Sequence, residues 1–277
     1  MPKLLNEAQV AHYKRDGYHF PIDILSAAEA AQARANLEAH EARTGGPIRG
    51  DLRHKPHLYL PWLNELVRHP RILDAVEDVL GANLFCWSTT FFIKEPNDPG
   101  YVSWHQDATY WGLSSPDVAT IWLAFTPANL ENGCMKFMPG THTAQAPHSD
   151  TFHKDNLLSR GQEIAVEVDD SKGVFGVLNP GQASLHHVLL VHGSAPNRSP
   201  DRRIGLAIRY IPTYVKQAIG VQDSATLVRG TDTFGYFEPE PSPAADHDPA
   251  AMAFHAEVVR RQAQILYRGT DKQEFRA

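Results

Sequence analysis

Residues 84–93 read LFCWSTTFFI, a run of aromatic and β-branched side chains that is typical of a β-strand. Similar runs follow at 118–125, 134–138, 164–168, 184–192 and 203–211, and most are separated by turn-forming clusters such as Asn132-Gly133 and Pro139-Gly140. The sequence lacks the alternating strand and helix units that would predict a parallel sheet. The pattern therefore predicts a mainly β core, built as a sandwich or barrel of short strands.

Helices are expected on both sides of this core. A first helix follows Asn6 and ends near Gly17, and a second runs from Ser26 to about Arg43 with a capping-box pair at Ser26 and Glu29. A third covers 70–80, and the last covers 250–267. Between them, 140–160 is predicted as a polar loop or lid, and the Pro-rich stretch 238–249 as a surface connection. We expect one domain over 1–277, with a helical part at 1–82, a β core at 83–215 and a C-terminal segment and helix at 216–277.

Composition excludes several classes of protein. The chain is 42% hydrophobic and 21% charged, as expected of a globular domain, and no apolar run reaches the roughly 18 residues that span a bilayer. A net charge of -6 without a basic patch argues against a nucleic-acid partner. Cys86 and Cys134 form no CxxC pair, and the start of the chain shows no secretory signal. These features favour a cytoplasmic protein with a small-molecule substrate and no membrane partner; they carry no signal of oligomeric state.

A metal site is predicted at Trp104-His105-Gln106-Asp107. Side chains two apart on an extended strand point to the same side, so His105 and Asp107 can face one point. His192, at the end of the apolar run 188–191, supplies a second imidazole from another strand. Two histidines and one carboxylate form a facial triad that leaves coordination positions open for a 2-oxo acid and O2, as in non-heme Fe(II) oxygenases.

An arginine is available for the far carboxylate of such an acid. Arg203 follows His192 by eleven residues and opens the strand 203–210, where alternation places Arg203, Gly205, Ala207 and Arg209 on one face. A guanidinium binds a carboxylate through two parallel hydrogen bonds. The small residues beside Arg203 leave room for a ligand.

Three segments resemble motifs of the phytanoyl-CoA dioxygenase family: HQDATYW (105–111), ENGCMKFMPGTH (131–142) and VHGSAPNRSPDRRIGLAIRY (191–210). The resemblance covers roughly residues 84–212. It implies a double-stranded β-helix, also called a jelly roll or cupin-like barrel, and an Fe(II)- and 2-oxoglutarate-dependent dioxygenase that uses O2. It also implies that His105, Asp107 and His192 bind the iron. The cosubstrate would then be bound by Arg203, Ser194 and Trp122.

Hydroxylation is the reaction that the motif favours. Halogenases of the wider superfamily carry Ala or Gly where this chain has Asp107, so the resemblance disfavours halogenation. Two other classes stay open: a cupin-like metal enzyme that does not use 2-oxoglutarate, and a non-catalytic relative that only binds a metal or ligand. The first would usually carry a histidine at 107 and a nearby glutamate ligand, and the second would have lost a ligand.

The substrate is expected to be a small polar or anionic metabolite, because the chain has no basic cradle for a coenzyme A phosphate. Tyr110 and Trp111 follow the metal motif and are candidates for the substrate mouth. If the strand 184–192 is regular, His186 faces inward with His192, and Arg209 faces inward by the alternation above. Lys94 lies on the strand before the motif. The alternatives are a hydrogen-bonded core histidine for His186 and a structural salt bridge for Arg209.

Overall fold

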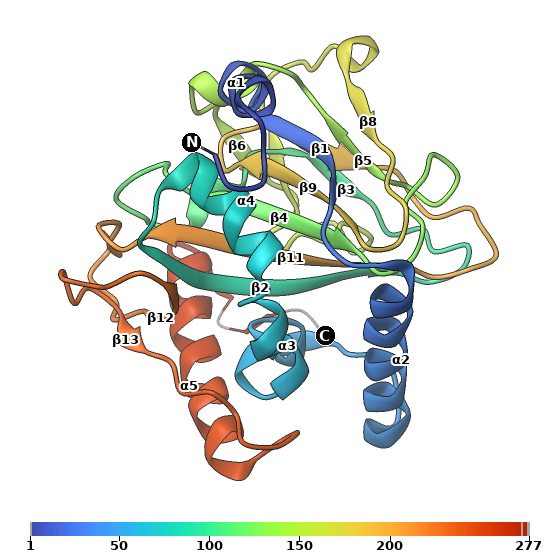
Figure 1. Cartoon of the computed structure of the whole chain (residues 1–277). Helices are drawn as coiled ribbons and strands as arrows, with labels where there is room; N and C mark the ends of the chain where they lie inside the picture. The colour runs from blue at the N-terminus through green and yellow to red at the C-terminus, as the bar shows by residue number, and fades with distance from the viewer. Residues whose placement is uncertain (1, 273, 276–277) are drawn as a thin grey trace.

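The computed structural model describes residues 2–272, 274 and 275, and its strands form two main sheets with helices around them (Figure 1). The helices are α1 (Glu7–Asp16), α2 (Ala27–Thr44), α3 (Pro61–Leu66), α4 (Pro70–Leu80) and α5 (Pro249–Leu266). The strands are β1 (Tyr18–Asp23), β2 (Leu84–Lys94), β3 (Val102–His105), β4 (Ala119–Ala124), β5 (Met135–Phe137), β6 (His148–Asp150), β7 (Gln162–Ile164), β8 (Val174–Gly176), β9 (Gln182–His187), β10 (His192–Ser194), β11 (Arg203–Pro212), β12 (Ser224–Arg229) and β13 (Glu238–Pro239). Short 3-10 turns include η1 (Gly50–Arg53), η2 (Pro56–Leu58) and η3 (Asp107–Tyr110).

The larger sheet has seven strands in the order β1-β9-β4-β11-β2-β12-β13, and the smaller has four in the order β3-β10-β5-β8. Strands pair antiparallel in both sheets except at β12–β13. Side chains from both sheets share one apolar cluster, which includes Tyr18, Trp122 and Phe137. Two antiparallel sheets packed face to face in this way form the jelly roll that the sequence predicted.

The two faces of β11 have different environments. Ile204, Leu206 and Ile208 belong to the main core, which also contains Ile72 and Val76 of α4. Each such aliphatic side chain stabilises the fold by roughly 1.5–3 kcal/mol when fully buried. The opposite face of the strand points between the sheets, where Arg203, Ala207 and Arg209 line a cavity. The strand is therefore buried on both faces. Packing of its outer face against the main core fixes the position of the backbone that carries the inward side chains.

Helix boundaries follow the local signals in the sequence. Asn6 and Ser26 each cap a helix through a complete capping box, with Gln9 and Glu29 as the third residues. Gly17 ends α1 in the left-handed conformation, which glycine adopts without steric cost. In Figure 1, α2, α3 and α5 lie below β2, whereas most strands fill the upper half. No helix in the described part of the chain has the length and hydrophobicity that crossing a bilayer requires.

The structure differs from the expected elements at several places, one of which is the predicted loop 140–160, since it contains the turn η4 (Thr141–Thr143) and the strand β6. The N-terminal part is not wholly helical, because β1 pairs with β9 at the edge of the large sheet. The run 184–192 is two strands with a turn between them, and the run 164–168 is strand only at its start, in β7. The stretch 238–249 is not only a surface connection, because Glu240 is buried and forms an ion pair with the buried Lys55.

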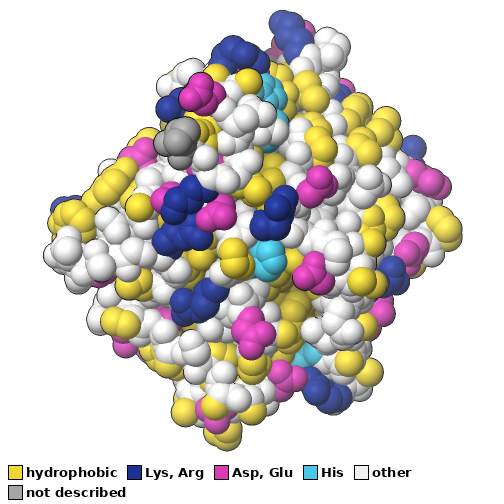
Figure 2. Space-filling view, viewed as in Figure 1, with side chains coloured by type: hydrophobic (Ala, Val, Ile, Leu, Met, Phe, Trp, Pro, Cys, Tyr) yellow, Lys and Arg dark blue, Asp and Glu magenta, His cyan; other side chains and the backbone are white. Residues whose placement is uncertain are grey.

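Charged side chains are distributed without a dominant sign on the face shown in Figure 2, where basic and acidic groups alternate with apolar ones. This face offers no continuous basic stripe of the kind that neutralises a phosphate backbone.

Candidate active site

The three predicted metal ligands come together at the junction of two neighbouring strands of the small sheet. His105 ends β3 and His192 begins β10; their Cα atoms are paired across the ladder, and their rings lie 4.2 Å apart between centroids. Gln106 has an extended backbone, so Asp107 projects to the same side as His105 although η3 begins there. All three side chains are buried, and one potential ligand atom from each lies within 4.8 Å of the others.

Both histidines are oriented by backbone carbonyls. His105 Nδ1 lies 2.9 Å from the Ser103 oxygen and 3.0 Å from the His192 oxygen, and His192 Nδ1 lies 2.9 Å from the Leu190 oxygen. A carbonyl accepts only from a protonated nitrogen, so Nδ1 carries the hydrogen and the Nε2 lone pairs are directed to the shared point. His105 Nε2 lies 3.3 Å from Asp107 Oδ1. The arrangement has the donor set of a facial triad, which fits an Fe(II) ion.

Burial and charge set the protonation of His192 and Asp107. Burial, with help from the neighbouring His105, lowers the pKa of His192 to about 4, so that its ring is neutral near pH 7. Burial opposes ionisation of Asp107, but the adjacent His105, His192 and Arg209 side chains outweigh it and hold the pKa of this carboxyl below its ordinary value. A neutral imidazole and a carboxylate are the forms that bind a cation.

Gln106, between two of the ligands, has a supporting role that the sequence did not reveal. Its amide nitrogen donates to the carbonyls of Ala144 (2.8 Å) and Leu189 (2.6 Å), and its amide oxygen accepts from the backbone N–H of Ala146 (2.7 Å). Gln106 thus ties the segment before β6 and the turn before β10 to the metal motif. Because its side chain alternates with those of His105 and Asp107, it faces away from the ligands.

A cavity of about 400 Å³ adjoins the three ligands and ends at Arg203. Arg203 is 1% exposed; it donates to the Gly133 carbonyl at 2.7 Å, its Nε has no partner, and no carboxylate in the described residues forms an ion pair with it. Burial lowers the pKa of Arg203 to about 10, which still leaves it charged near pH 7. A buried guanidinium with unused donors next to a metal-type triad fits the far carboxylate of a diacid chelated at the triad.

Ser194 and Trp122 both line this cavity. The guanidinium of Arg203 lies 5.2 Å from the Trp122 ring, within cation–π range. A Cβ atom at Gly205 would overlap the indole of Trp122, so the small residue beside Arg203 makes room for this ring rather than for a ligand. The sequence analysis was therefore right that a small residue is needed at Gly205, but the space is filled by the Trp122 ring and not by a ligand.

Lys94, expected near the substrate, lines neither cavity at the site. Its Nζ donates to the Ser194 hydroxyl at 2.7 Å and to the Ala195 carbonyl, and the side chain is fully buried. Burial and the neighbouring Arg203 lower its pKa to about 6. Because Lys94 donates to Ser194 Oγ, the hydroxyl hydrogen of Ser194 is left free to donate elsewhere. Lys94 therefore has the geometry of a positioning residue for Ser194.

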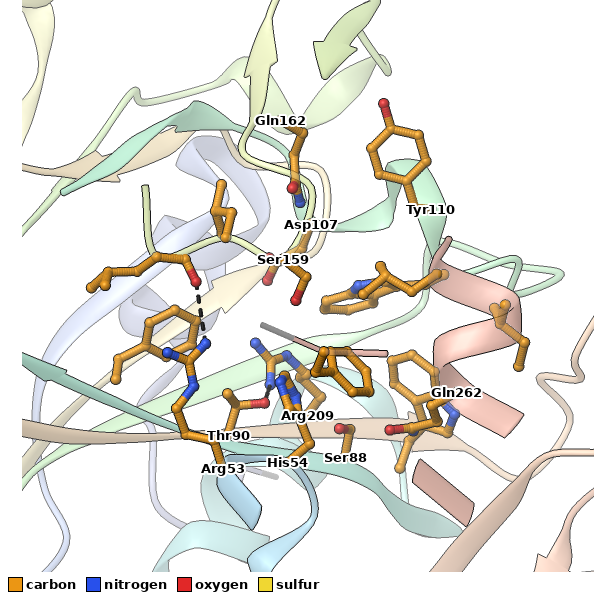
Figure 3. A pocket seen from close by; sticks show the side chains of 18 residues that line it. Arg53, His54, Ser88, Thr90, Asp107, Tyr110, Ser159, Gln162, Arg209 and Gln262 are labelled. Atoms are coloured by element: carbon orange, nitrogen blue, oxygen red, sulfur yellow. Dashed lines mark hydrogen bonds between the residues drawn. The ribbon is translucent and has the colours of Figure 1, made fainter. Parts of the chain in front are cut away.

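A second cavity, of about 680 Å³, lies on the other side of Asp107 (Figure 3). Tyr110, Trp111 and Arg209, three of the substrate candidates named from the sequence, line it. His186 instead lines the cavity that holds Arg203, with its ring 4.8 Å from that of His192 and no partner for its Nδ1. His186 and His192 thus share a cavity although the run between them is not a regular strand.

Several residues of the second cavity carried no local signal in the sequence. Arg53 and His54 enter from η1 and the residue after it, and Gln262 and Phe275 enter from α5 and the C-terminal end. Ser88, Thr90 and Phe92 share one face of β2 by alternation, and a register shift opposite Arg209 and Tyr210 adds Trp87 to them. The others come from segments far apart in the chain, and only the tertiary structure brings them together.

Comparisons with known proteins agree with this geometry. A family model described as Phytanoyl-CoA dioxygenase (PhyH) matches residues 4–205. A probable alpha-ketoglutarate-dependent hypophosphite dioxygenase from Stutzerimonas stutzeri is 30% identical over 159 residues, which are 56% of this chain and 54% of that protein. The chain spans about half the length of the first curated relatives it matches.

Two solved structures are similar over nearly the whole chain. One, described as the non-heme monooxygenase ThoJ in its apo form, is 37% identical with a TM-score of 0.83 and covers 93% of this chain and 97% of its own. The other, described as CytC3 with Fe(II) and alpha-ketoglutarate, is 25% identical with a TM-score of 0.67 and covers 86% of this chain and 94% of its own.

Proposed function

The chain belongs to the phytanoyl-CoA dioxygenase family, and on that premise we propose that it is an Fe(II)- and 2-oxoglutarate-dependent oxygenase that hydroxylates a C–H bond of a small polar or anionic metabolite. The observation that carries the proposal is the pairing of a buried His105–Asp107–His192 cluster with the unpaired Arg203 in one cavity. The similar proteins described as an alpha-ketoglutarate-dependent dioxygenase and as CytC3 with Fe(II) and alpha-ketoglutarate support Fe(II) and 2-oxoglutarate as the groups bound here.

His105, Asp107 and His192 would hold the iron, and the cavity beside them would hold 2-oxoglutarate. When bound, the iron and 2-oxoglutarate supply the activation of O2 and the oxidising power for hydroxylation, with succinate and carbon dioxide as coproducts. Arg203 binds the far carboxylate of the diacid, and Ser194 donates its hydroxyl hydrogen to the same group. Trp122 packs beside Arg203 and excludes water from this pair.

The protein positions the substrate rather than transforming it directly. Tyr110 and Trp111, from η3 and the residue after it, form a wall of the second cavity directly after the ligand Asp107. Asp107 and Arg209 line both cavities, so a substrate in the second cavity lies beside the metal ligands. Hydroxylation is favoured over halogenation because Asp107 supplies a carboxylate at the position that a halogenase leaves free for a halide.

The unpaired Arg203 separates this proposal from a cupin-like enzyme that needs no 2-oxo acid. Such an enzyme has no diacid to bind and no use for a buried guanidinium with unused donors, which is costly to desolvate. The proposal is also favoured over a non-catalytic relative, because such a relative would have lost one of the candidate iron ligands, and His105, Asp107 and His192 are all present.

An anaerobic titration tests the proposal. Fe(II) and 2-oxoglutarate added to the purified protein should produce a weak visible charge-transfer band, which His192→Ala abolishes. His187→Ala is the matched control, because His187 lines neither cavity and its removal should leave the band unchanged. In air, the wild type should release succinate when a substrate is present. A wild type without the band, or a band that survives His192→Ala, would refute the proposal.

The substrate is then identified by measuring the succinate released with each member of a panel of small metabolites. Mass spectrometry should find a product heavier by one oxygen atom, and no halogenated product when chloride or bromide is added.

A further inference from the structure

The second cavity contains two arginine side chains from distant parts of the chain. Arg53 enters from η1 and Arg209 from β11, and their guanidinium groups lie near one another beside Thr90 (Figure 3). Phe92, Asp107 and Arg209 belong to this cavity and also to the one that ends at Arg203, so they form the wall between the two. The pair of arginines thus lies next to the metal ligands, on the side away from Arg203.

Neither arginine has its hydrogen-bonding capacity filled. Arg53 Nη2 donates to the Leu157 carbonyl at 3.2 Å, and Arg209 Nη1 donates to the Thr90 hydroxyl at 2.7 Å. The Nε atoms of both are buried without a partner. A guanidinium has five N–H donors, so most of the donors in this pair have no acceptor among the described residues.

No acidic side chain in the described residues forms an ion pair with Arg53 or Arg209. Asp107 is the nearest source of negative charge to Arg209, but it is a metal ligand and its charge is shared with the cation. Burial lowers the pKa of both arginines, and the positive charge of Arg209 lowers that of Arg53 further. Arg209 is buried and Arg53 is half-buried, so these two like charges without a counter-ion destabilise the folded protein, and an anionic ligand between them would offset this cost.

Aromatic and aliphatic side chains form much of the rest of the cavity, alongside polar ones such as Ser88, Gln162 and Gln262. Trp87 and Trp111 pack with ring centroids 5.0 Å apart, and Arg209 lies 5.2 Å from the Trp111 ring. On the opposite side, Phe275 stacks on His54 at 3.8 Å. A lining of aromatic and aliphatic side chains with a few polar groups is typical of sites that bind a small organic molecule.

We propose that the substrate is an amphipathic acid whose oxyanion group is bound by Arg53 and Arg209 and whose apolar body packs against Trp87 and Trp111. The proposal rests on the proposed function, because the cavity is a substrate site only if Asp107 holds the reacting metal. It goes further by assigning Arg53, in a segment outside both sheets, as a specificity-determining residue. A carboxylate offers two coplanar acceptor oxygens and a phosphoryl group offers three in a tripod. Both can accept hydrogen bonds from two guanidiniums, so the test includes both.

Binding to the Fe(II)-loaded protein without O2 or 2-oxoglutarate tests the assignment without relying on turnover. Phenylacetate, phenylphosphonate and the neutral phenylacetamide are titrated against the protein, with the quenching of tryptophan fluorescence and calorimetry as readouts. We expect at least one of the two anions to bind about tenfold or more tightly than the amide, since a charge-assisted bidentate contact is worth at least that factor.

Four variants locate the anion. Arg53→Met and Arg209→Met should each remove the preference for the anion while phenylacetamide still binds. Arg49→Met is the matched control, because Arg49 is an exposed arginine in the same segment and lines neither cavity. Arg203→Met should leave the preference intact, which excludes binding of the probe in the cosubstrate cavity.

The melting temperature gives a second, independent readout. Removing one of two unpaired like charges should leave the melting temperature of Arg53→Met unchanged or raise it, whereas a structural arginine would lower it on removal. The proposal is overturned by equal affinities for anion and amide, by an Arg49→Met effect equal to that of Arg53→Met, by loss of the preference in Arg203→Met, or by a lower melting temperature in Arg53→Met.

Failure of this proposal and failure of the proposed function give different results. The charge-transfer band with Fe(II) and 2-oxoglutarate depends on His192 and Arg203 and not on Arg53. A normal band without a preference for anions refutes only the substrate class. An absent band refutes the oxygenase, whatever the anion preference.

Discussion

Replacing Glu240 by Gln should destabilise the fold more than any exposed charge substitution, because Glu240 is half of a fully buried ion pair. Its Oε1 lies 2.5 Å from Lys55 Nζ, and neither side chain is exposed. The hydroxyls of Ser224 and Thr226 donate to the same carboxylate at 2.8 and 2.6 Å. Lys55 lies between η1 and η2, so this pair fixes the segment that carries Arg53 into the second cavity.

The size of the effect follows from what remains after the substitution. In Glu240→Gln the Lys55 ammonium stays buried without a counter-charge, and removal of one partner from a buried pair typically costs about 3–5 kcal/mol. Glu257→Gln is the matched control, because Glu257 pairs with Arg260 on the surface with both side chains half exposed, and such a pair contributes about 0–1 kcal/mol. The double variant Lys55→Met/Glu240→Leu removes both charges and should recover most of the lost stability.

The pH dependence has a definite sign. Burial alone would raise the pKa of Glu240, but the charge of Lys55 and the contact with His57 outweigh it and lower this pKa from 4.5 to about 2. The carboxylate therefore contributes stability above pH 4.5, and this contribution is lost as the pH falls through about 2. The difference in the free energy of unfolding between wild type and Glu240→Gln should therefore become smaller as the pH falls from 4.5 to about 2.

Urea unfolding followed by tryptophan fluorescence measures these differences, at about pH 7 and again at about pH 3. The reasoning is wrong if Glu240→Gln costs no more than Glu257→Gln, or if the double variant is less stable than Glu240→Gln. It is also wrong if the free energies of unfolding of wild type and Glu240→Gln differ by as much at the acidic pH as at the neutral pH.

Three further substitutions test the cosubstrate cavity. Arg203→Met should weaken 2-oxoglutarate binding by about 100-fold or more while Fe(II) still binds, as measured by titration of the charge-transfer band, because the buried bidentate pair is lost; an affinity within threefold of wild type would contradict this role. Gly205→Ala should destabilise the fold by about 1–3 kcal/mol in urea and raise the KM for 2-oxoglutarate, because the new Cβ displaces Trp122; unchanged stability would count against it. Lys94→Met should raise the KM for 2-oxoglutarate by about tenfold with little change in kcat, because Ser194 loses its donor; a lower kcat at an unchanged KM would argue against positioning.

The long strands of the fold could be predicted from sequence because their composition and period are unambiguous. β2 and β11 run side by side over almost their whole length, and the alternation in β11 correctly separated Arg203 and Arg209 from Ile204 and Ile208. The run 184–192 was harder. Its first part pairs with β4 in the large sheet and His192 pairs with β3 in the small one, so a turn has to carry the chain between sheets. Apolar periodicity does not show which sheet a residue joins.

The site divides in the same way. The cluster of His105, Asp107 and His192 could be predicted because two of its members lie two residues apart on an extended segment, and the inward face of Arg203 could be predicted from alternation along its strand. Arg53 and Phe275 could not, because they lie more than 200 residues apart and meet only through packing of η1 against the C-terminal end. Glu240 was missed for a related reason: a lone charged residue in a Pro-rich stretch is usually exposed, and its partner Lys55 is far away in sequence.

The two cavities are built from different kinds of structure, and this difference has a functional consequence. Arg203, Trp122 and Ser194 lie on strands whose neighbours hold them in register through ladder hydrogen bonds. Arg53 and Phe275 lie on a 3-10 turn and on the C-terminal end, outside both sheets. A change in the strands would disturb the metal ligands through the shared ladders, whereas a change in the outer segments would not. The sheets therefore fix the cavity that ends at Arg203 together with Trp87 and Arg209 of the second cavity, and if the proposed substrate site is correct, the part of it that can vary without loss of the metal site is the part formed by Arg53 and Phe275.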